Sequence, residues 1–220
     1  MNIANEPQDK TIHFYLDFIS PYGYLAAMKV EAIAEKYGRQ VQWHPMLLGV
    51  TVVNVMGLKP LMETPLKRDY LMHDVPRLAS LFDLPIRFTL PPNPLPSARA
   101  LYWVKQHYPA LTGSFVKGVC KAIWQLGKDI SDANVLVQIA QPLGINSDRL
   151  LAAISTKEVK AGLTREVDEA MAKGVFGTPT MIIDEQIIWG CDRFWMLEHW
   201  LRHGSWDSQP GLTSEAVTIE

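Results

Sequence analysis

The first 45 residues place the strongest constraint on how this chain folds. Over residues 11–18 apolar side chains alternate with polar or polar-tipped ones, the period-2 pattern of a β-strand. Ser20 and Pro21 end this strand, and apolar residues then recur at helical spacing until Gly38, a natural helix C-cap. Gln40–Pro45 alternates again. We therefore predict a β-α-β unit whose two strands are parallel.

The β pattern disappears between residues 46 and 156, where helical spacing takes over. A helix is expected over 66–82, kinked or split because Pro76 interrupts it. The proline-rich segment 91–96 predicts a connecting turn, and Ser97 is expected to cap the helix that follows. This stretch is therefore predicted to be entirely helical.

The last quarter of the chain returns to mixed α/β order. A helix beginning near residue 157 is expected to end at Gly174. Two short strands, Thr180–Ile183 and 187–189, flank the polar turn 184–186, which predicts an antiparallel hairpin before a final helix.

The order of these elements predicts an α/β protein with a thioredoxin-like fold and an all-helical subdomain inserted after the first β-α-β unit. We expect residues 1–45 and 157–204 to form the thioredoxin-like domain and residues 46–156 to form the insertion. Residues 205–220 are polar and lack a core-forming pattern, so they are expected to form a C-terminal tail.

Composition excludes several classes of partner. The 21 basic and 23 acidic residues nearly cancel, so no positive field is available to bind nucleic acid. No stretch reaches the ~20 apolar residues of a membrane span, and the chain does not start with the basic and apolar regions of a signal peptide. We therefore expect a cytoplasmic protein. Cys120 and Cys191 are its only cysteines, which argues against a disulfide framework and a metal site.

Ser20 stands where the first predicted strand turns into the first helix. A helix N-terminus presents free amide donors and a positive dipole end to an anion. A thiol–disulfide oxidoreductase needs a cysteine here and a second one three residues later, whereas this chain has Ser20 and Gly23. A serine hydroxyl can instead donate a hydrogen bond to a thiolate brought in by a ligand. The alternative is that Ser20 is only a helix N-cap.

Two later segments are expected to lie near this turn. Thr178-Pro179 precedes a strand, where an X-Pro bond in a tight turn is often cis, and the Thr178 amide and carbonyl can pair with a peptide-like ligand. The alternative is an ordinary proline entering an edge strand. Asp192 lies at or next to the N-cap of the last helix, where it suits an α-ammonium and carboxylate group or simply caps the helix. Cys191 is expected to be a small, partly buried residue.

Six motifs carry a family resemblance over most of residues 12–202. They are FYLDFISPYGYLA at 14–26, HPMLLG at 44–49, KRDYLMHDVPRLA at 67–79, GKDISD at 127–132, GVFGTPTMIID at 174–184 and IWGCDRFWMLE at 188–198. With these motifs the chain resembles the 2-hydroxychromene-2-carboxylate isomerases and the related kappa-class glutathione transferases, in the DsbA-like branch of the thioredoxin fold. The two C-terminal motifs are the most specific.

The resemblance implies a glutathione-dependent isomerase with a small, aromatic-derived substrate and a homodimeric assembly. Glutathione would serve as a recycled cofactor, whose thiolate adds to the substrate and leaves again. The resemblance gives the catalytic role to Ser20, which would stabilise the thiolate. The residues that it assigns to the glutathione site are Ser20, Pro21, Tyr22, Lys59, Thr178, cis-Pro179, Cys191 and Asp192. Tyr22 would also line the wall beside the sulfur and contact the substrate.

The chain departs from the family pattern near the expected substrate. It has Val53 where the family usually has a lysine, and Leu58 where the family has an asparagine, while Lys59 and Pro60 match. Asn54 is the candidate that replaces the missing polar group. Two alternatives to the isomerase therefore stay open: a kappa-like transferase that releases a glutathione conjugate, and a non-catalytic protein that binds glutathione or a peptide.

Overall fold

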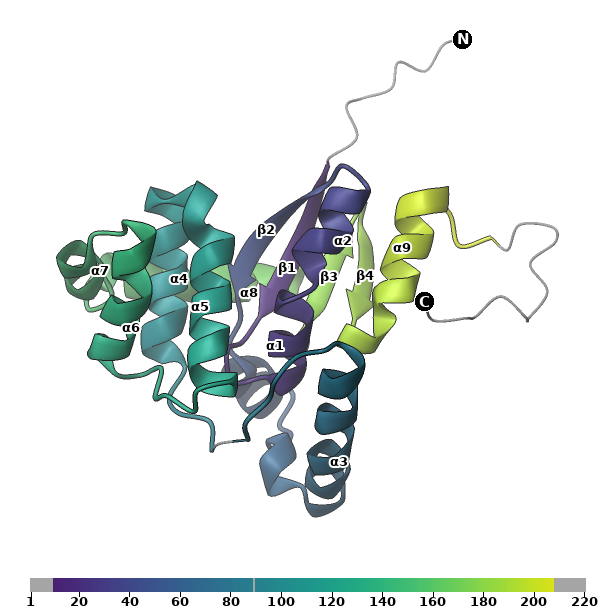
Figure 1. Cartoon of the computed structure of the whole chain (residues 1–220), viewed down its shortest axis with the longest axis horizontal. Helices are drawn as coiled ribbons and strands as arrows, with labels where there is room; N and C mark the ends of the chain where they lie inside the picture. Colours follow the sequence, from purple (N-terminus) through teal and green to yellow (C-terminus); the bar gives the residue numbers. More distant parts are fainter. Residues whose placement is uncertain (1–9, 89, 208–220) are drawn as a thin grey trace, which may run out of the picture.

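The computed structural model describes residues 10–88 and 90–207. A four-stranded sheet with the order β2-β1-β3-β4 occupies its centre (Figure 1). The strands are β1 (Thr11–Leu16), β2 (Gln40–Pro45), β3 (Thr180–Ile183) and β4 (Gln186–Trp189). β2 is parallel to β1, whereas β3 is antiparallel to both β1 and β4. The predicted β-α-β unit and the predicted hairpin are both confirmed.

Helices surround this sheet on both faces and at one end. They are α1 (Pro21–Ala27), α2 (Val30–Lys36), α3 (Pro65–Leu81), α4 (Leu95–His107), α5 (Thr112–Trp124), α6 (Ala133–Ala140), α7 (Ser147–Ala153), α8 (Lys157–Ala172) and α9 (Phe194–His203). The shorter helical segments are η1 (Gly49–Val55), η2 (Leu61–Glu63), η3 (Pro109–Leu111), η4 (Gln141–Leu143) and η5 (Cys191–Arg193). Helices α4–α7 gather beside β2 and α9 lies beside β4, while α3 extends past the end of the sheet from which α1 starts (Figure 1). None of the helices within the described ranges is long and apolar enough to span a bilayer.

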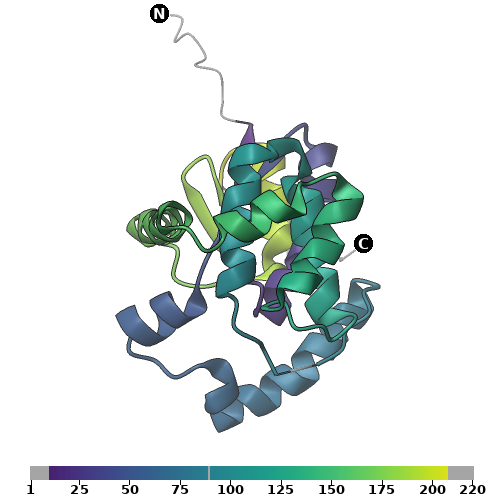
Figure 2. The ribbon, with the colours of Figure 1, turned by 90° about the vertical axis from the view of Figure 1, so that its left-hand side faces the viewer.

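Strand β1 separates two clusters of buried side chains. Ile12 and Phe14 on one face pack in the large cluster that contains α1 and α5. Tyr15 on the other face packs against Leu163 and Val167 of α8, which packs beside α4 and is drawn in light green in Figure 2. Because both faces are covered, the position at which β1 ends is fixed between two cores.

Two predicted features of the N-terminal half are corrected by the structure. β1 ends at Leu16 and not at residue 18, because the Asp17 carbonyl accepts the Ser20 amide at 3.0 Å and turns the chain. The expected single helix from Pro21 to Gly38 is broken into α1 and α2. Met28 and Lys29 between them keep right-handed helical dihedral angles, so the apolar spacing continues across the break and gives no sign of it.

Proline-containing segments give two further differences from the prediction. Of the two forms expected at Pro76, a kinked or a split helix, the split form is wrong, because α3 continues through this residue. Pro76 is exposed, so the carbonyl that lacks its N–H donor lies on the solvent side. Ser97 does not cap α4, which already begins at Leu95. The Asn93 side chain accepts the Leu95 amide at 3.0 Å, and the Ser97 hydroxyl donates to the Pro94 carbonyl.

The C-terminal part follows the prediction closely. Gly174 has a φ of 87° just after α8, as a glycine beyond a helix C-terminus often does. The hairpin turn contains only Asp184 and Glu185, both with positive φ, because Gln186 already pairs with Ile183. Between residues 46 and 156 the described chain has no strand. The domain bounds stay a prediction, and the tail 205–220 lies outside the described residues beyond residue 207.

Candidate active site

Ser20 combines two roles in the structure. It is the N-cap of α1, with its Oγ accepting the Gly23 amide at 3.0 Å, and Pro21 follows in the first helical turn. The same hydroxyl donates to the Thr178 carbonyl at 3.3 Å and is buried. The alternative prediction, that Ser20 is a helix N-cap, is therefore correct. This role does not exclude hydrogen bonding to a ligand thiolate, because the hydroxyl also faces the backbone edge before β3.

The peptide bond between Thr178 and Pro179 is cis, as expected. The Pro179 carbonyl accepts the Gly190 amide at 2.9 Å, which ties the end of β4 to this turn. The Thr180 hydroxyl donates to the Gly177 carbonyl at 2.7 Å and closes the turn from the other side. The Thr178 hydroxyl is buried and, within the described chain, makes no hydrogen bond. This turn thus offers an unsatisfied polar atom beside Ser20.

Asp192 lies in η5, between β4 and α9. It does not cap α9, whose N-cap is Arg193 and has no side-chain cap. Its carboxylate instead pairs with Arg193 Nη1 at 2.8 Å and stays about half exposed. Gly190 before it has a φ of 111°, and a Cβ there would lie 2.5 Å from Asp192 Oδ1. A glycine is therefore needed for this approach to the carboxylate.

A carboxylate on α3 that the sequence did not single out joins this group of residues. Asp74 accepts the Tyr22 hydroxyl at 2.9 Å on one oxygen and the Tyr70 hydroxyl at 3.1 Å on the other. Burial, followed by the hydrogen bond to Asp74, raises the pKa of Tyr22, so its phenol is a neutral donor. The only signal in the sequence was the spacing of Tyr70 and Asp74, one helical turn apart in a family motif.

Asn54, which was expected near the substrate, and Lys59, which was expected near glutathione, make no polar contact with Ser20 within the described chain. Asn54 is exposed in η1, and Lys59 is exposed in the loop before η2. Among the described residues no hydrogen bond or ion pair joins either side chain to Ser20. Val53 and Leu58, which replace the polar residues of the family pattern, are 40% and 49% exposed. The structure therefore brings together Ser20, Thr178, Tyr22 and the η5 residues, but not Asn54 and Lys59.

Both cysteines are free and buried. Burial, assisted by the charge of Asp192, raises the pKa of Cys191 to about 12. Burial alone raises the pKa of Cys120. A thiolate is the reactive form of cysteine, so neither side chain is suited to thiol–disulfide exchange at neutral pH.

We therefore expect both thiols of the native protein to resist modification. At pH 8 a thiol-specific reagent such as a chromogenic disulfide should react slowly with the folded chain, and rapidly with both cysteines after unfolding in guanidinium. The released chromophore counts the thiols in each case. Rapid native labelling that disappears in Cys191→Ser would contradict the assignment of Cys191 as an inert residue.

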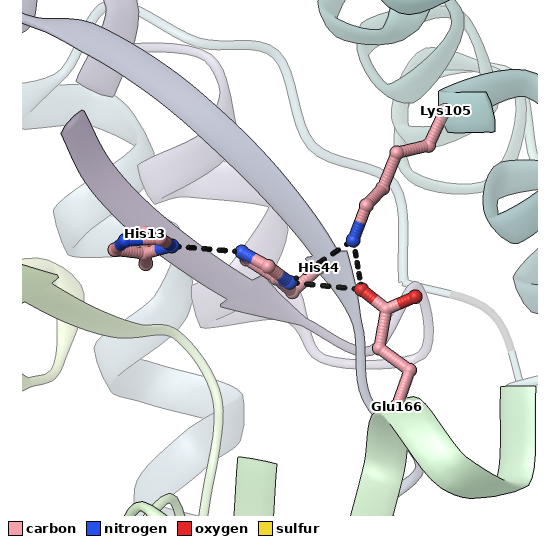
Figure 3. A network of polar contacts seen from close by, with 4 residues as sticks. All are labelled: His13, His44, Lys105 and Glu166. Carbon is pink, nitrogen blue, oxygen red and sulfur yellow. Dashed lines mark hydrogen bonds and ion pairs between the residues drawn. The ribbon is translucent and has the colours of Figure 1, made fainter. Parts of the chain in front are cut away.

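A second polar group lies on the opposite face of β1 and β2, away from the predicted site. His44 Nδ1 lies 2.8 Å from Glu166 Oε1, and its Nε2 lies 3.1 Å from His13 Nδ1 (Figure 3). Lys105 of α4 also pairs with Glu166. Burial lowers the pKa of His44, which fits a neutral ring that donates to Glu166 and accepts from His13. A cavity of about 350 Å³ opens onto these residues and includes none of those predicted for the glutathione site.

Comparison with known proteins decides the family. A family model for the DsbA-like thioredoxin domain matches residues 11–202. The chain is also 32% identical to a 2-hydroxychromene-2-carboxylate isomerase of Sphingobium xenophagum over 196 residues, covering 87% of this chain and 98% of that one. The chain belongs to the DsbA-like thioredoxin family. Both the resemblance read from the motifs and the predicted fold are confirmed.

Within this family, two further relatives agree with the assignment. The solved structure of a 2-hydroxychromene-2-carboxylate isomerase superimposes with a TM-score of 0.78 at 26% identity, covering 86% of this chain and 93% of that one. Glutathione S-transferase kappa 1 of Rattus norvegicus is 23% identical over 209 residues, covering 89% of this chain and 92% of the rat protein. The isomerases thus share more identity with the chain than this transferase does.

Proposed function

We propose that the protein is a glutathione-dependent isomerase of the 2-hydroxychromene-2-carboxylate isomerase type, with Ser20 as its catalytic residue. The observation that carries this proposal is the contact between the Ser20 hydroxyl and the Thr178 carbonyl next to a cis proline. The contact brings a hydroxyl donor, a helix N-terminus and a backbone edge to one place. A peptide thiol needs these three features to bind and to ionise.

The local geometry fits glutathione. The Ser20 hydroxyl donates to Thr178 over 3.3 Å, a long hydrogen bond that is inexpensive to exchange. If this hydroxyl turns to a ligand sulfur, the Thr178 carbonyl becomes free to accept an amide N–H of the same ligand. The Thr178 hydroxyl, buried without a partner within the described chain, is available to a further polar atom. A cysteinyl unit offers the sulfur and the amide together.

The protein's own groups favour a negative charge at this point. The Ser20 hydroxyl donates a hydrogen bond, and the N-terminus of α1 adds the positive end of its dipole. An ordinary thiol with a pKa of about 8.5 would otherwise be mostly protonated at neutral pH. When bound, glutathione supplies the thiolate that adds to a substrate double bond and leaves after rotation. Tyr22, held by Asp74, would form the wall beside the sulfur.

The remaining predicted site residues are assigned either to the rest of glutathione or to the substrate. We assign Cys191 and Asp192, through the backbone and carboxylate of η5, to the γ-glutamyl end, with Pro21 in the first turn of α1. Lys59 would contact glutathione and Asn54 the substrate from the segment that contains η1. Both side chains are exposed and are therefore free to contact a bound ligand.

The substrate class, the assembly and the compartment complete the proposal. We infer a small aromatic-derived substrate, in line with the isomerase relatives. We also infer a cytoplasmic homodimer. The exposed apolar side chains that support a dimer lie on η1, η2, α3 and their connections, and include Val53, Val55, Met56, Leu58, Leu61 and Leu66.

Product analysis tests this function. The protein is incubated with 2-hydroxychromene-2-carboxylate, with and without glutathione, and the products are followed by proton NMR. We expect the trans isomer only when glutathione is present, with the glutathione concentration unchanged at the end. A stable conjugate would indicate a transferase instead, and tight glutathione binding without any turnover would indicate a non-catalytic binding protein.

A further inference from the structure

Asp17 is a buried carboxyl group that the proposed glutathione site does not use. It lies in the turn between β1 and α1, and it is 1% exposed. Its Oδ1 accepts the Ile19 amide at 3.2 Å, and its Oδ2 accepts the Leu48 amide at 2.8 Å. Its own carbonyl accepts the Ser20 amide at 3.0 Å. One residue thus joins the turn that carries Ser20 to the segment that enters η1.

We propose that Asp17, in its ionised form, is a positioning residue that holds η1 in the placement that the isomerisation requires. This inference rests on the proposed function. Leu48 directly precedes η1, and η1 carries Val53 and Asn54, where the candidate substrate residues depart from the family pattern. Ser20 has its own side-chain bonds to Gly23 and Thr178, so the loss of Asp17 would affect η1 more than the thiol site.

The two hydrogen bonds require a carboxylate. An ionised carboxyl accepts on both oxygens, and here each oxygen receives one amide N–H. Protonation turns one oxygen into a donor, which then faces a second donor in the Ile19 or Leu48 amide. A buried amide left without an acceptor is costly, so the chain at Leu48 is expected to shift when Asp17 binds a proton.

Asp17 changes between its protonated and its ionised form close to neutral pH. Burial raises the pKa of Asp17 to about 7, while the amides of Leu48 and Ile19 act in the opposite direction. On the same face of the sheet, burial raises the pKa of Tyr15 to about 12 and lowers that of His44, so both are neutral near pH 7. The other titratable groups that line the cavity on this face, from β1, α4, α8 and its C-cap, are His13, Tyr102, Lys105, Arg165, Glu166, Glu169 and Lys173.

Several of these groups are engaged with one another. Glu166 is paired with His44 and Lys105, and His13 contacts His44. Along β1, Tyr15 separates His13 from Asp17. The pKa of Asp17 itself is set by burial and by the amides of Leu48 and Ile19. We therefore expect the ionisation that controls the placement of Leu48 to be that of Asp17.

The pH profile of kcat/KM at saturating glutathione tests this inference on the full-length enzyme. In the wild type the acid side should approach a slope of two, because the thiol and Asp17 must both lose a proton. In Asp17→Asn the slope should fall to one. The rate at pH 8 should drop about tenfold or more, because a carboxamide supplies only one acceptor oxygen. Glutathione affinity, measured by calorimetry, should fall much less than the rate, because the Ser20 and Thr178 contacts of the thiol site stay in place.

Asp132→Asn is the matched control. Asp132 caps α6 by accepting the Asn134 amide at 2.8 Å and is exposed, so this variant loses a comparable carboxylate far from Ser20. It should keep the two-proton slope and the wild-type rate. A two-proton slope in Asp17→Asn, or a parallel loss of glutathione affinity, would overturn the inference.

A measurement on the wild type covers the case in which Asp17→Asn does not fold. Carbon-13 NMR of labelled aspartate carboxyl groups should show one that titrates near pH 7. If every aspartate titrates near its usual value of about 4, the inference is wrong. Failure of the wild type to bind glutathione would instead reject the proposed function, so the two failures are distinguishable.

Discussion

Ser20→Ala should lower isomerase activity near neutral pH by about tenfold or more, while glutathione still binds. The substitution removes one hydrogen-bond donor from the sulfur but leaves the Thr178 edge and the amides of α1 in place. A hydrogen bond to a charged group contributes about 1.5 to 3 kcal/mol. Its loss should raise the pKa of the bound thiol by roughly one to two units and reduce the thiolate fraction accordingly.

A threonine that caps another helix provides the control that separates the loss of the thiolate hydrogen bond from the loss of a helix cap. Ser20 caps α1, so Ser20→Ala also costs about 1 kcal/mol of stability. Thr156 caps α8 by accepting the Val159 amide at 3.2 Å. Thr156→Ala should therefore lose similar stability in a urea titration while keeping full activity. If the two variants have equal activity, Ser20 is only a cap.

Glu166→Ala should cause a large loss of stability, about 3 kcal/mol or more. Glu166 is buried at 9% exposure and holds both His44 and Lys105 (Figure 3). Removing one member of a buried charged group leaves the others unpaired, which typically costs 3–5 kcal/mol. Urea unfolding followed by circular dichroism gives the difference. Glu166→Gln should lose less, because its amide oxygen can still accept from His44.

An exposed ion pair provides the control for this prediction. Asp69 pairs with Arg68 at 3.1 Å on the surface of α3, with side chains 63% and 47% exposed. Asp69→Ala should change stability by less than about 1 kcal/mol. Equal losses in Asp69→Ala and Glu166→Ala would show that the buried group contributes no more than a surface pair.

The effect of Glu166 also has a defined pH dependence. Burial alone would raise its pKa, but the hydrogen bond with His44 and the charge of Lys105 outweigh burial and hold the pKa below its usual 4.5. A carboxyl whose pKa is lowered by folding stabilises the protein above its unfolded pKa and loses this contribution as the pH falls through the folded pKa. The stability gap between wild type and Glu166→Ala should therefore narrow below about pH 4.5.

Sequence patterns predicted the sheet and the placement of Ser20 because these depend on local signals. Alternation over β1 and β2, the Ser20-Pro21 stop and the hairpin turn each follow from neighbouring residues. The expected cis bond before Pro179 is also observed, although the local pattern left an ordinary turn proline open as the alternative. These local signals set the order of elements, and that order leaves few topologies.

Two of the features that were missed depend on contacts between distant segments. Asp74 meets Tyr22 only because α3 packs beside α1, and no local pattern reports this contact. The sequence pattern made Asp17 one of the polar residues of an alternating strand. In the structure it follows the end of β1, and its carboxylate accepts the Leu48 amide.

Two other misses are local. The break between α1 and α2 preserves the apolar spacing, so the sequence pattern does not report it. Ser97 does not cap α4 because the helix already begins at Leu95, whose amide donates to the Asn93 side chain.

The pKa of bound glutathione can be measured on the wild-type protein from the ultraviolet absorbance of its thiolate, titrated against pH. We expect the bound thiol to ionise at a pKa clearly below the ~8.5 of an ordinary thiol, because the Ser20 hydroxyl and the α1 dipole stabilise its charge. A bound thiol with a pKa at or above ~8.5 would contradict the role of Ser20, as would the absence of binding at millimolar glutathione.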